Sequence, residues 1–312
     1  MHADEIPIGV ETVRALLADQ FPLWAELPIE RVDSSGTVNA MFRLGDSMVV
    51  RLPFVAHGAP GIDHEAAWLP RLAPHLPVLV PTVLGVGRPS AGYSFSWLVL
   101  DWLVGEHPNP ADERSSPGFT LDLARFISAL RTIDITGAPV GHRGGSFHSL
   151  DESVRGCLAQ IDDLQGAGVL NTGVLNTGVP DIGVLDIDVL TEIWDEAMAA
   201  PEWTGPPVWV HCDLLAANLL VADGGLAGVL DFASSGVGDP SCDLMPAWSL
   251  LTSDTRSDFR DALAADDAMW SRGRGWMLAQ AAIALPYYRH TNRMMADNSL
   301  RALLELTNER LH

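Results

Sequence analysis

The chain contains no lysine, because all 19 of its basic residues are arginines. Schiff-base and lysine-nucleophile chemistry are therefore excluded. Arginine keeps its proton and offers a planar fork to phosphate, so it can still neutralise an anionic ligand. Positive charge is also scarce, since 40 acidic residues give a net charge of -21. This excess argues against nucleic acid or an anionic membrane as partner. It is compatible with a cationic small substrate, and equally with a generic acidic surface.

Cysteine and long apolar runs are rare as well. Cys157, Cys212 and Cys242 show no metal or redox spacing, so we expect reduced thiols, although the last two flank the motif described next and could come close together. No apolar run is long enough to span a membrane, and residues 1–5 lack the features of a signal peptide. We expect a cytoplasmic protein of about two domains that is a monomer or a weak homodimer.

The most informative segment is His-Cys-Asp-Leu-Leu-Ala-Ala-Asn at residues 211–218, followed by Asp231-Phe232. Apolar stretches at 208–210, 219–221 and 226–230 predict strands around it. Metal-dependent phosphoryl transfer needs one carboxylate to orient the acceptor hydroxyl, and an amide and a second carboxylate to hold Mg²⁺. Asp213, Asn218 and Asp231 supply these groups in that order. The alternative is that the first two only satisfy turn backbone.

The segment Gly-Val-Gly-Asp-Pro-Ser-Cys-Asp-Leu at residues 236–244 completes the pattern. Together these motifs resemble the aminoglycoside phosphotransferase family of antibiotic kinases. The resemblance implies that Asp213 is the catalytic carboxylate and that Asn218 and Asp231 hold Mg²⁺. It also implies that Asp243 braces the catalytic loop.

Within this pattern, His211 would be a structural member of the loop. Asp239 is predicted to cap a helix that begins at Pro240. Two residues depart from the family, Cys212 at a usual glycine and Ala233 after the aromatic residue, and we expect the loop to remain intact.

The amino-terminal half is expected to bind the nucleotide. A turn at residues 34–37 is rich in small residues, so the backbone N–H groups of Ser34, Ser35 and Gly36 could approach phosphates. The resemblance assigns Arg51 to the place of the lysine that grips the nucleotide phosphates. Glu65 would be its ion-pair partner. A lone arginine at the end of an apolar strand could otherwise be a surface charge.

The segment 96–106 is an apolar strand that breaks at Val104-Gly105. The resemblance makes it the hinge, at about 101–105, whose backbone at Asp101 and Leu103 contacts the base. An ordinary buried strand is the alternative. The implied fold is α+β and protein-kinase-like, with a small β-rich lobe at residues 1–103 and a larger, mainly helical lobe at 104–312.

Helical periodicity predicts a helix over about residues 1–20, with Thr12 as a possible cap, and a second near 63–73. The pattern becomes helical again from about residue 118, and once more beyond residue 243. Residues 168–190 repeat a five-residue unit, which we interpret as a surface loop from a slipped duplication rather than a solenoid.

Carboxylates of the second lobe could bind ammonium groups of the acceptor, and three tryptophans could line the acceptor pocket or belong to the core. These residues are Asp254, Asp258, Asp261, Asp266, Asp267, Trp248, Trp270 and Trp276.

These expectations combine into an enzyme that phosphorylates a hydroxyl of an aminoglycoside or similar antibiotic, with ATP or GTP as donor and Mg²⁺ as cofactor. Within the same chemistry, the acceptor could be another hydroxylated metabolite, a macrolide or a nucleoside antibiotic. From a different class, the chain could be a non-catalytic nucleotide-binding relative. A hydrolase finds little support, because no G-x-S-x-G elbow and no zinc spacing occur.

Overall fold

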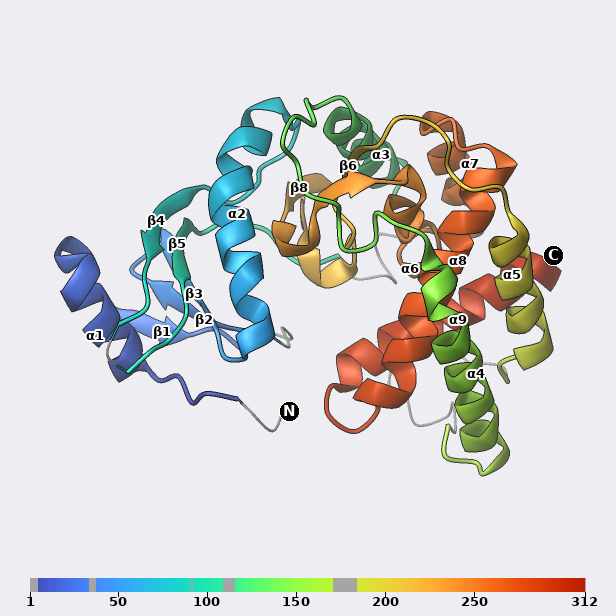
Figure 1. Cartoon of the computed structure of the whole chain (residues 1–312), viewed down its shortest axis with the longest axis horizontal. Helices are drawn as coiled ribbons and strands as arrows, with labels where there is room; N and C mark the ends of the chain where they lie inside the picture. Colours follow the sequence, from blue (N-terminus) through green and yellow to red (C-terminus); the bar gives the residue numbers. More distant parts are fainter. Residues whose placement is uncertain (1–4, 34–37, 91, 109–115, 171–183, 312) are drawn as a thin grey trace. The chain divides into compact units, whose positions relative to one another are not determined.

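The computed structural model describes residues 5–33, 38–90, 92–108, 116–170 and 184–311. The amino-terminal part is a sheet with two helices, and the carboxy-terminal part is mainly helical (Figure 1).

The chain divides into two compact units. The first comprises Met1–Glu106 together with Ala227–Ala233, and the second comprises His107–Leu226 together with Ser234–His312. Asp231 therefore belongs to the same unit as the amino-terminal sheet, although more than 100 residues separate it from that sheet in sequence.

The first unit contains a five-stranded antiparallel sheet in the order β1-β2-β3-β5-β4. The strands are β1 (Ile29–Arg31), β2 (Asn39–Leu44), β3 (Met48–Pro53), β4 (Val83–Gly87) and β5 (Trp97–Asp101).

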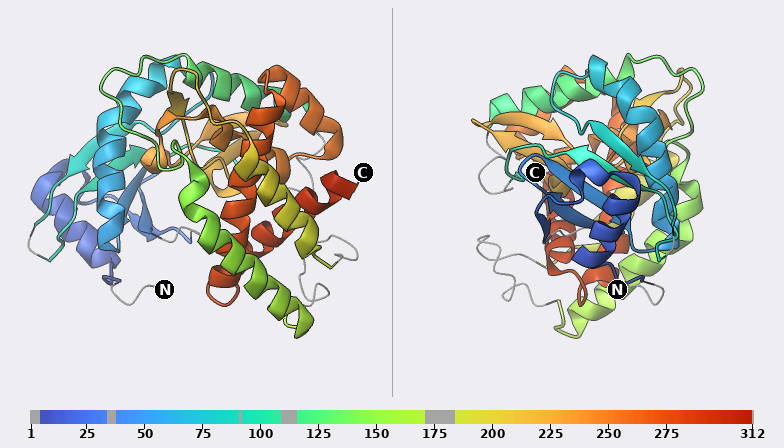
Figure 2. Two further views of the ribbon diagram at one scale, coloured as in Figure 1. Left: turned by 45° about the vertical axis from the view of Figure 1, so that its right-hand side comes forward. Right: turned by 90° about the vertical axis from the view of Figure 1, so that its left-hand side faces the viewer.

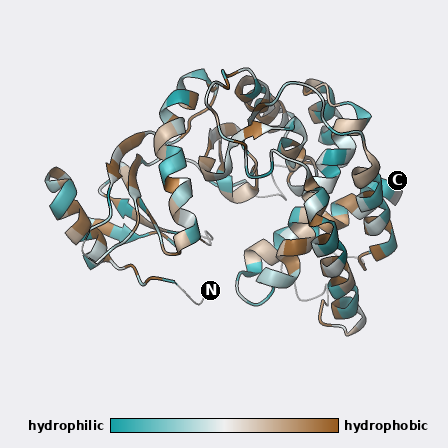
Figure 3. Cartoon of the chain, viewed as in Figure 1, coloured by the Kyte–Doolittle hydropathy of each residue, from teal (hydrophilic) through white to brown (hydrophobic). Residues whose placement is uncertain are grey.

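The alternation of side chains along β3 gives the sheet two different faces. On one face Val50 packs in a buried cluster with α1 (Val10–Gln20). On the other, Val49 packs in a cluster that includes α2 (Ala59–Leu72). Arg51 shares the Val49 face, so its side chain is directed toward α2. Figure 3 shows both helices with teal and brown turns, as expected of helices with one buried face.

The predictions made for these two helices are confirmed only in part. Helix α1 begins after Gly9, so Thr12 lies inside the helix and its prediction as a cap is wrong. Helix α2 buries Ile62, Glu65 and Leu69 at helical spacing, which places a carboxylate among apolar residues on the face that packs on the sheet.

The second unit is built mainly from helices. They are α3 (Pro117–Arg131), α4 (Asp151–Gly166), α5 (Ile187–Ala199), α6 (Pro246–Ser249), α7 (Ser253–Ala262), α8 (Asp267–Tyr288) and α9 (Arg293–Leu311). Helix α8 packs against α4, α5 and α9, and Figures 1 and 2 show α4 and α5 beside it. It is therefore the central helix of this unit.

Helices α4 and α5 were not expected from the sequence. Helix α4 buries Val154, Leu158 and Ile161, a helical spacing that could have revealed it. Helix α5 begins after Asp186, whose side chain accepts from Val189 N, and its first turn lies inside the segment interpreted as a repeat loop. Residues 171–183 of that segment lie outside the described residues.

The strands predicted around the central motif are present. β6 (Val208–Val210) pairs with β9 (Gly236–Gly238), and β7 (Leu219–Ala222) pairs with β8 (Gly225–Val229). The strands predicted on either side of the central motif are therefore confirmed.

Across the part of the chain that the structure describes, every helix is too short or too polar to cross a membrane.

Candidate active site

A buried carboxylate holds the loop that follows β6. Asp243 lies in the short 3₁₀ helix Pro240–Leu244, and its oxygens accept from His211 N at 2.8 and 3.1 Å and from Cys212 N at 2.9 Å. Burial raises the pKa of Asp243, and the nearby His211 and these backbone donors counteract that effect. The prediction that Asp243 braces this loop is confirmed.

The same short helix is capped as predicted. Asp239 accepts from Ser241 N at 2.9 Å, and Pro240 occupies the first turn. Asp239 also pairs with Arg272 of α8, whose Nε lies 2.7 Å from Oδ2. The cap thus ties the 3₁₀ helix, and with it Asp243, to the central helix of the unit.

Cys212 has a left-handed backbone conformation, with φ of 69°. That conformation costs a non-glycine residue about 1–2 kcal/mol, which explains why glycine suits this position. The loop nevertheless forms with cysteine in place. The Cys212 and Cys242 sulfur atoms are buried 3.9 Å apart, so the expected approach of the two thiols is confirmed.

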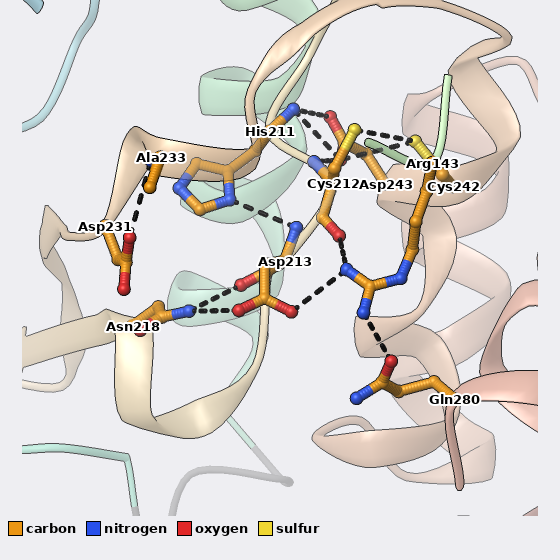
Figure 4. A network of polar contacts seen from close by, with 10 residues as sticks. All are labelled: Arg143, His211, Cys212, Asp213, Asn218, Asp231, Ala233, Cys242, Asp243 and Gln280. Atoms are coloured by element: carbon orange, nitrogen blue, oxygen red, sulfur yellow. Dashed lines mark hydrogen bonds and ion pairs between the residues drawn. The ribbon is translucent and has the colours of Figure 1, made fainter. Parts of the chain in front are cut away.

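Asn218 fixes one side of the Asp213 carboxylate. Its Nδ2 donates to Asp213 Oδ2 at 2.8 Å and to the Asp213 carbonyl at 2.9 Å. The backbone adds a bond from Asn218 N to Leu215 O at 2.9 Å. Figure 4 shows the bonds from the Asn218 amide to Asp213. The Asp213 side chain is 27% exposed, so part of the carboxylate is accessible.

The amide of Asn218 suits a role as a magnesium ligand. Because its nitrogen donates to Asp213, its oxygen is directed to the opposite side, and amide and carboxylate oxygens are ligands that Mg²⁺ prefers. Among the described residues, no group of three His, Cys, Asp or Glu side chains is placed to hold a metal by itself.

Arg143 contacts the other side of Asp213 and was missed by the sequence analysis. Its Nη1 lies 3.2 Å from Asp213 Oδ1 and also donates to the Cys212 carbonyl, while Nη2 donates to Gln280 Oε1. The only available signal was an arginine followed by two glycines. Nothing in one sequence links this arginine to Asp213.

The first unit has a second polar cluster, centred on Arg51. Arg51 Nη1 lies 2.6 Å from Glu65 Oε2, and Nη2 lies 2.8 Å from Asp231 Oδ1. Glu65 also accepts from Phe232 N at 2.8 Å. The structure therefore brings together three residues that the sequence analysis had selected, two as nucleotide-binding and one as a metal ligand.

Burial dominates the electrostatics of this cluster. It raises the pKa of Glu65 to about 7, although the Arg51 guanidinium opposes the shift. Burial alone would lower the pKa of Arg51, but its attraction to Asp231 and Glu65 raises it instead. Asp231 is 39% exposed and has a positive φ of 58°, so its carboxylate is the accessible member of the three.

Of the five remaining nucleotide-binding candidates, the structure describes two. Asp101 ends β5, and its N–H donates to Thr82 O at 3.1 Å, so a contact to a base would have to use its carbonyl. Leu103 is half-buried two residues beyond the strand. Ser34, Ser35 and Gly36 lie outside the described residues.

The acidic residues near α7 are exposed, and two of them have structural partners. Asp266 caps α8 by accepting from Met269 N at 2.7 Å, and Asp267 pairs with Arg260. The three tryptophans are buried: Trp248 packs against Trp270 at 4.8 Å between ring centroids, and Trp276 packs against Phe147 at 5.3 Å.

Comparisons with known proteins identify the family to which the chain belongs and the solved structures that it resembles. The profile of the phosphotransferase enzyme family matches residues 30–276. No curated protein matches the chain. The GDP complex of wild-type aminoglycoside 2'-phosphotransferase-IIIa is 18% identical, with a TM-score of 0.68 over 97% of this chain and 100% of that one. Macrolide 2'-phosphotransferase MphH from Brachybacterium faecium is 21% identical, with a TM-score of 0.56 over 95% of this chain and 98% of that one.

The GDP and kanamycin complex of APH(2")-IIia is similar as well, at 18% identity and a TM-score of 0.67 over 96% of this chain and 99% of that one. Together with the antiparallel sheet and the helical second unit, these likenesses confirm the expected protein-kinase-like α+β fold.

Proposed function

Because the chain belongs to the phosphotransferase enzyme family and is a kinase acting on hydroxyl groups, we propose that it transfers the terminal phosphoryl group of ATP or GTP to a hydroxyl of an aminoglycoside or similar antibiotic. The observation that carries this proposal is the Asp213 carboxylate, which Asn218 fixes from one side and which remains 27% exposed. A carboxylate with these properties can orient a hydroxyl and accept its proton.

Asp213 is the catalytic carboxylate in this proposal. It accepts a hydrogen bond from the acceptor hydroxyl, aligns that oxygen with the terminal phosphorus, and takes the proton as the oxygen–phosphorus bond forms. The bond from that phosphorus to the bridging oxygen breaks, and the nucleoside diphosphate leaves with the electron pair. The Asn218 amide and the Asp231 carboxylate are assigned as ligands of Mg²⁺, which when bound neutralises phosphate charge.

Arg51 is assigned to the nucleotide phosphates, with Glu65 holding its guanidinium. The planar fork of arginine suits this task, although it cannot reproduce the point charge of a lysine. The backbone N–H groups of Ser34, Ser35 and Gly36 are proposed to approach the phosphates. The Asp101 carbonyl and the Leu103 backbone are proposed to contact the base.

This assignment makes residues 1–103 a nucleotide-binding lobe, residues 104–312 a catalytic and acceptor-binding lobe, and 101–105 the hinge between them. The grouping of Ala227–Ala233 with the first unit adds Asp231 to the elements that surround Arg51. It supports a function of Asp231 on the nucleotide side of the reaction.

The acceptor class rests on charge and on the similar structures. A net charge of -21 favours encounter with a polycationic acceptor. Similar structures were solved with kanamycin, gentamicin and streptomycin. A macrolide is the second candidate, favoured by the likeness to MphH. Nucleotides in these structures include GDP, ADP and ATP, so either purine triphosphate is a candidate donor.

A transfer screen tests the proposal. Purified protein is incubated with Mg²⁺ and terminally labelled ATP or GTP, together with kanamycin, gentamicin, streptomycin, a macrolide, or common amino alcohols and sugars. Label should move to one antibiotic class and not to the metabolites. Transfer only to a metabolite would assign the runner-up function. Nucleotide binding without transfer to any acceptor would identify a non-catalytic relative.

A further inference from the structure

The loop that carries Arg143 is fixed against β9. Gly141 N donates to Val237 O at 3.1 Å, and Asp239 N donates to Gly144 O at 3.0 Å. The approach is so close that a Cβ on Gly238 would lie 2.1 Å from Gly144 O. Arg143 therefore starts from a rigid backbone, and its place beside Asp213 does not depend on a mobile surface loop.

The guanidinium of Arg143 is fixed at both of its terminal nitrogens. Nη1 donates to the Cys212 carbonyl and to Asp213 Oδ1, and Nη2 donates to Gln280 Oε1 (Figure 4). Gln280 comes from α8, the central helix of the unit. The Arg143 side chain is only 15% exposed, so it is not a solvated surface charge.

These bonds have a direct consequence for the Asp213 carboxylate. Asn218 donates to Oδ2 and Arg143 donates to Oδ1, so the two donors fix the rotation of the carboxylate plane. Two bonds do not exhaust a carboxylate, because each oxygen has two lone pairs. The carboxylate can therefore be held in one orientation and still accept a bond from a substrate hydroxyl.

We propose that Arg143 is a positioning residue for phosphoryl transfer, which orients the Asp213 carboxylate toward the acceptor hydroxyl and is itself held by Gln280. This inference rests on the proposed function of Asp213. In this proposal Arg143 acts through Asp213, to which its Nη1 donates. Small misorientations of a reacting group reduce rate strongly, so the effect should be seen in kcat.

The first experiment compares Arg143→Met, Arg143→Lys and the wild-type enzyme. Release of ADP or GDP is measured with Mg²⁺ and kanamycin or a macrolide as the acceptor. Arg143→Met should reduce kcat by about 10–100-fold while both KM values change by less than about threefold. Arg143→Lys should recover part of the loss, because it restores one donor. Arg155→Met, a change at an exposed ion pair on α4, is the matched control and should leave turnover unchanged.

The second experiment uses Gln280→Leu, which removes the residue that holds Arg143 but leaves Arg143 and Asp213 themselves unchanged. It also covers the case that Arg143→Met does not fold. It should reduce kcat by about 3–30-fold. The double variant with Arg143→Met should be no slower than Arg143→Met alone, because Gln280 acts through Arg143. Additive losses would overturn the proposal, as would an unchanged kcat in Gln280→Leu.

Asp213→Ala, measured in parallel, distinguishes a failure of the positioning role of Arg143 from a failure of the proposed function. If Asp213→Ala is inactive while Arg143→Met keeps its kcat, or changes only KM, the positioning role is wrong and the proposed function stands. If Asp213→Ala is as active as the wild type, the proposed function itself is wrong. A crystal structure of Arg143→Met gives a readout without turnover, since the Asp213 carboxylate should leave its wild-type orientation. An unmoved carboxylate would contradict the positioning role.

Discussion

The two polar clusters of this protein have opposite arrangements of charge. In the second unit one carboxylate, Asp213, is held by two donors, Asn218 and Arg143. In the first unit one guanidinium, that of Arg51, is held by two carboxylates, Glu65 and Asp231. The difference agrees with the separate tasks proposed above, proton acceptance for Asp213 and phosphate binding for Arg51.

Burial separates the clusters further. Arg51 and Glu65 are almost fully buried, so their pairing is part of the core, whereas Asp213 is partly exposed. Each cluster also has one non-glycine residue with a positive φ, Cys212 at 69° and Asp231 at 58°. Such strain is found at functional sites, where surrounding contacts enforce it. The bonds to Asp243 and Arg51 are those contacts here.

The largest effect expected from either cluster is that of Asp213→Ala. Loss of a positioned proton acceptor should reduce turnover by about 10²–10⁴-fold, with nucleotide binding retained. Initial rates and nucleotide titrations on the folded variant measure both. Asp162→Ala, an exposed change on α4, is the control. If the variant keeps the full rate, Asp213 is not the proton acceptor, and the two clusters do not differ in the tasks proposed for them.

Asp231→Ala should have the next largest effect, on binding rather than on proton transfer. Loss of a magnesium ligand should weaken the binding of ATP in the presence of Mg²⁺ by about 100-fold. Binding of ATP in EDTA should change much less. Titration calorimetry with and without Mg²⁺ measures this. Asp223→Ala is a close control, because Asp223 also has a positive φ, of 53°, in a turn. Equal weakening with and without Mg²⁺ would contradict the assignment.

The two clusters also differ in how far sequence could predict them. Asp213, Asn218 and Asp231 were found because phosphoryl transfer needs those groups at characteristic spacing. Arg51 and Glu65 were assigned by resemblance, and the structure pairs them. The contacts made by Arg143 could not be predicted, since Arg143 and Asp213 are 70 residues apart and Arg143 and Gln280 are 137 apart.

The fold was predicted more evenly than the site. Continuous apolar stretches predicted the strands around the central motif and the strand at 96–106, and helical spacing predicted most helices, because burial imposes both patterns. Thr12 misled because a cap is chosen by backbone geometry, and Gly9 takes that position. The acidic residues near α7 show a different limit. Composition gives their charge, but only the structure shows that Asp266 caps a helix and Asp267 pairs with Arg260.

A smaller effect is expected from Arg51→Lys. A lysine has a single ammonium group and cannot reproduce the fork that reaches Glu65 and Asp231 together. Loss of one charged hydrogen bond should reduce the free energy of unfolding by about 1.5–3 kcal/mol. Urea unfolding measures it, with Arg125→Lys at an exposed pair as control. The KM for nucleotide should rise as well. A variant as stable as the wild type would show that one of the two ion pairs contributes nothing.

Glu65→Gln should have little effect at acidic pH, and its effect on stability should grow as the pH rises. Because burial raises the folded-state pKa of Glu65 to about 7, above its ordinary value of 4.5, the folded protein binds a proton more tightly than the unfolded chain. The stability that this proton contributes is complete below about pH 4.5 and lost as pH rises through 7. The free energy of unfolding of the wild type, relative to Glu65→Gln, should therefore fall across this window, by about 3 kcal/mol at most.

Urea unfolding of both proteins at several pH values between 4.5 and 8 measures that difference, and groups unaffected by the substitution cancel. Glu152→Gln on α4, an exposed position, controls for the loss of one charge. A difference that rises with pH would mean that attraction to Arg51 outweighs burial, so that the carboxylate is ionised throughout. The Arg51 cluster would then resemble the Asp213 cluster in that hydrogen-bond donors, and not burial, would determine the state of its carboxylate.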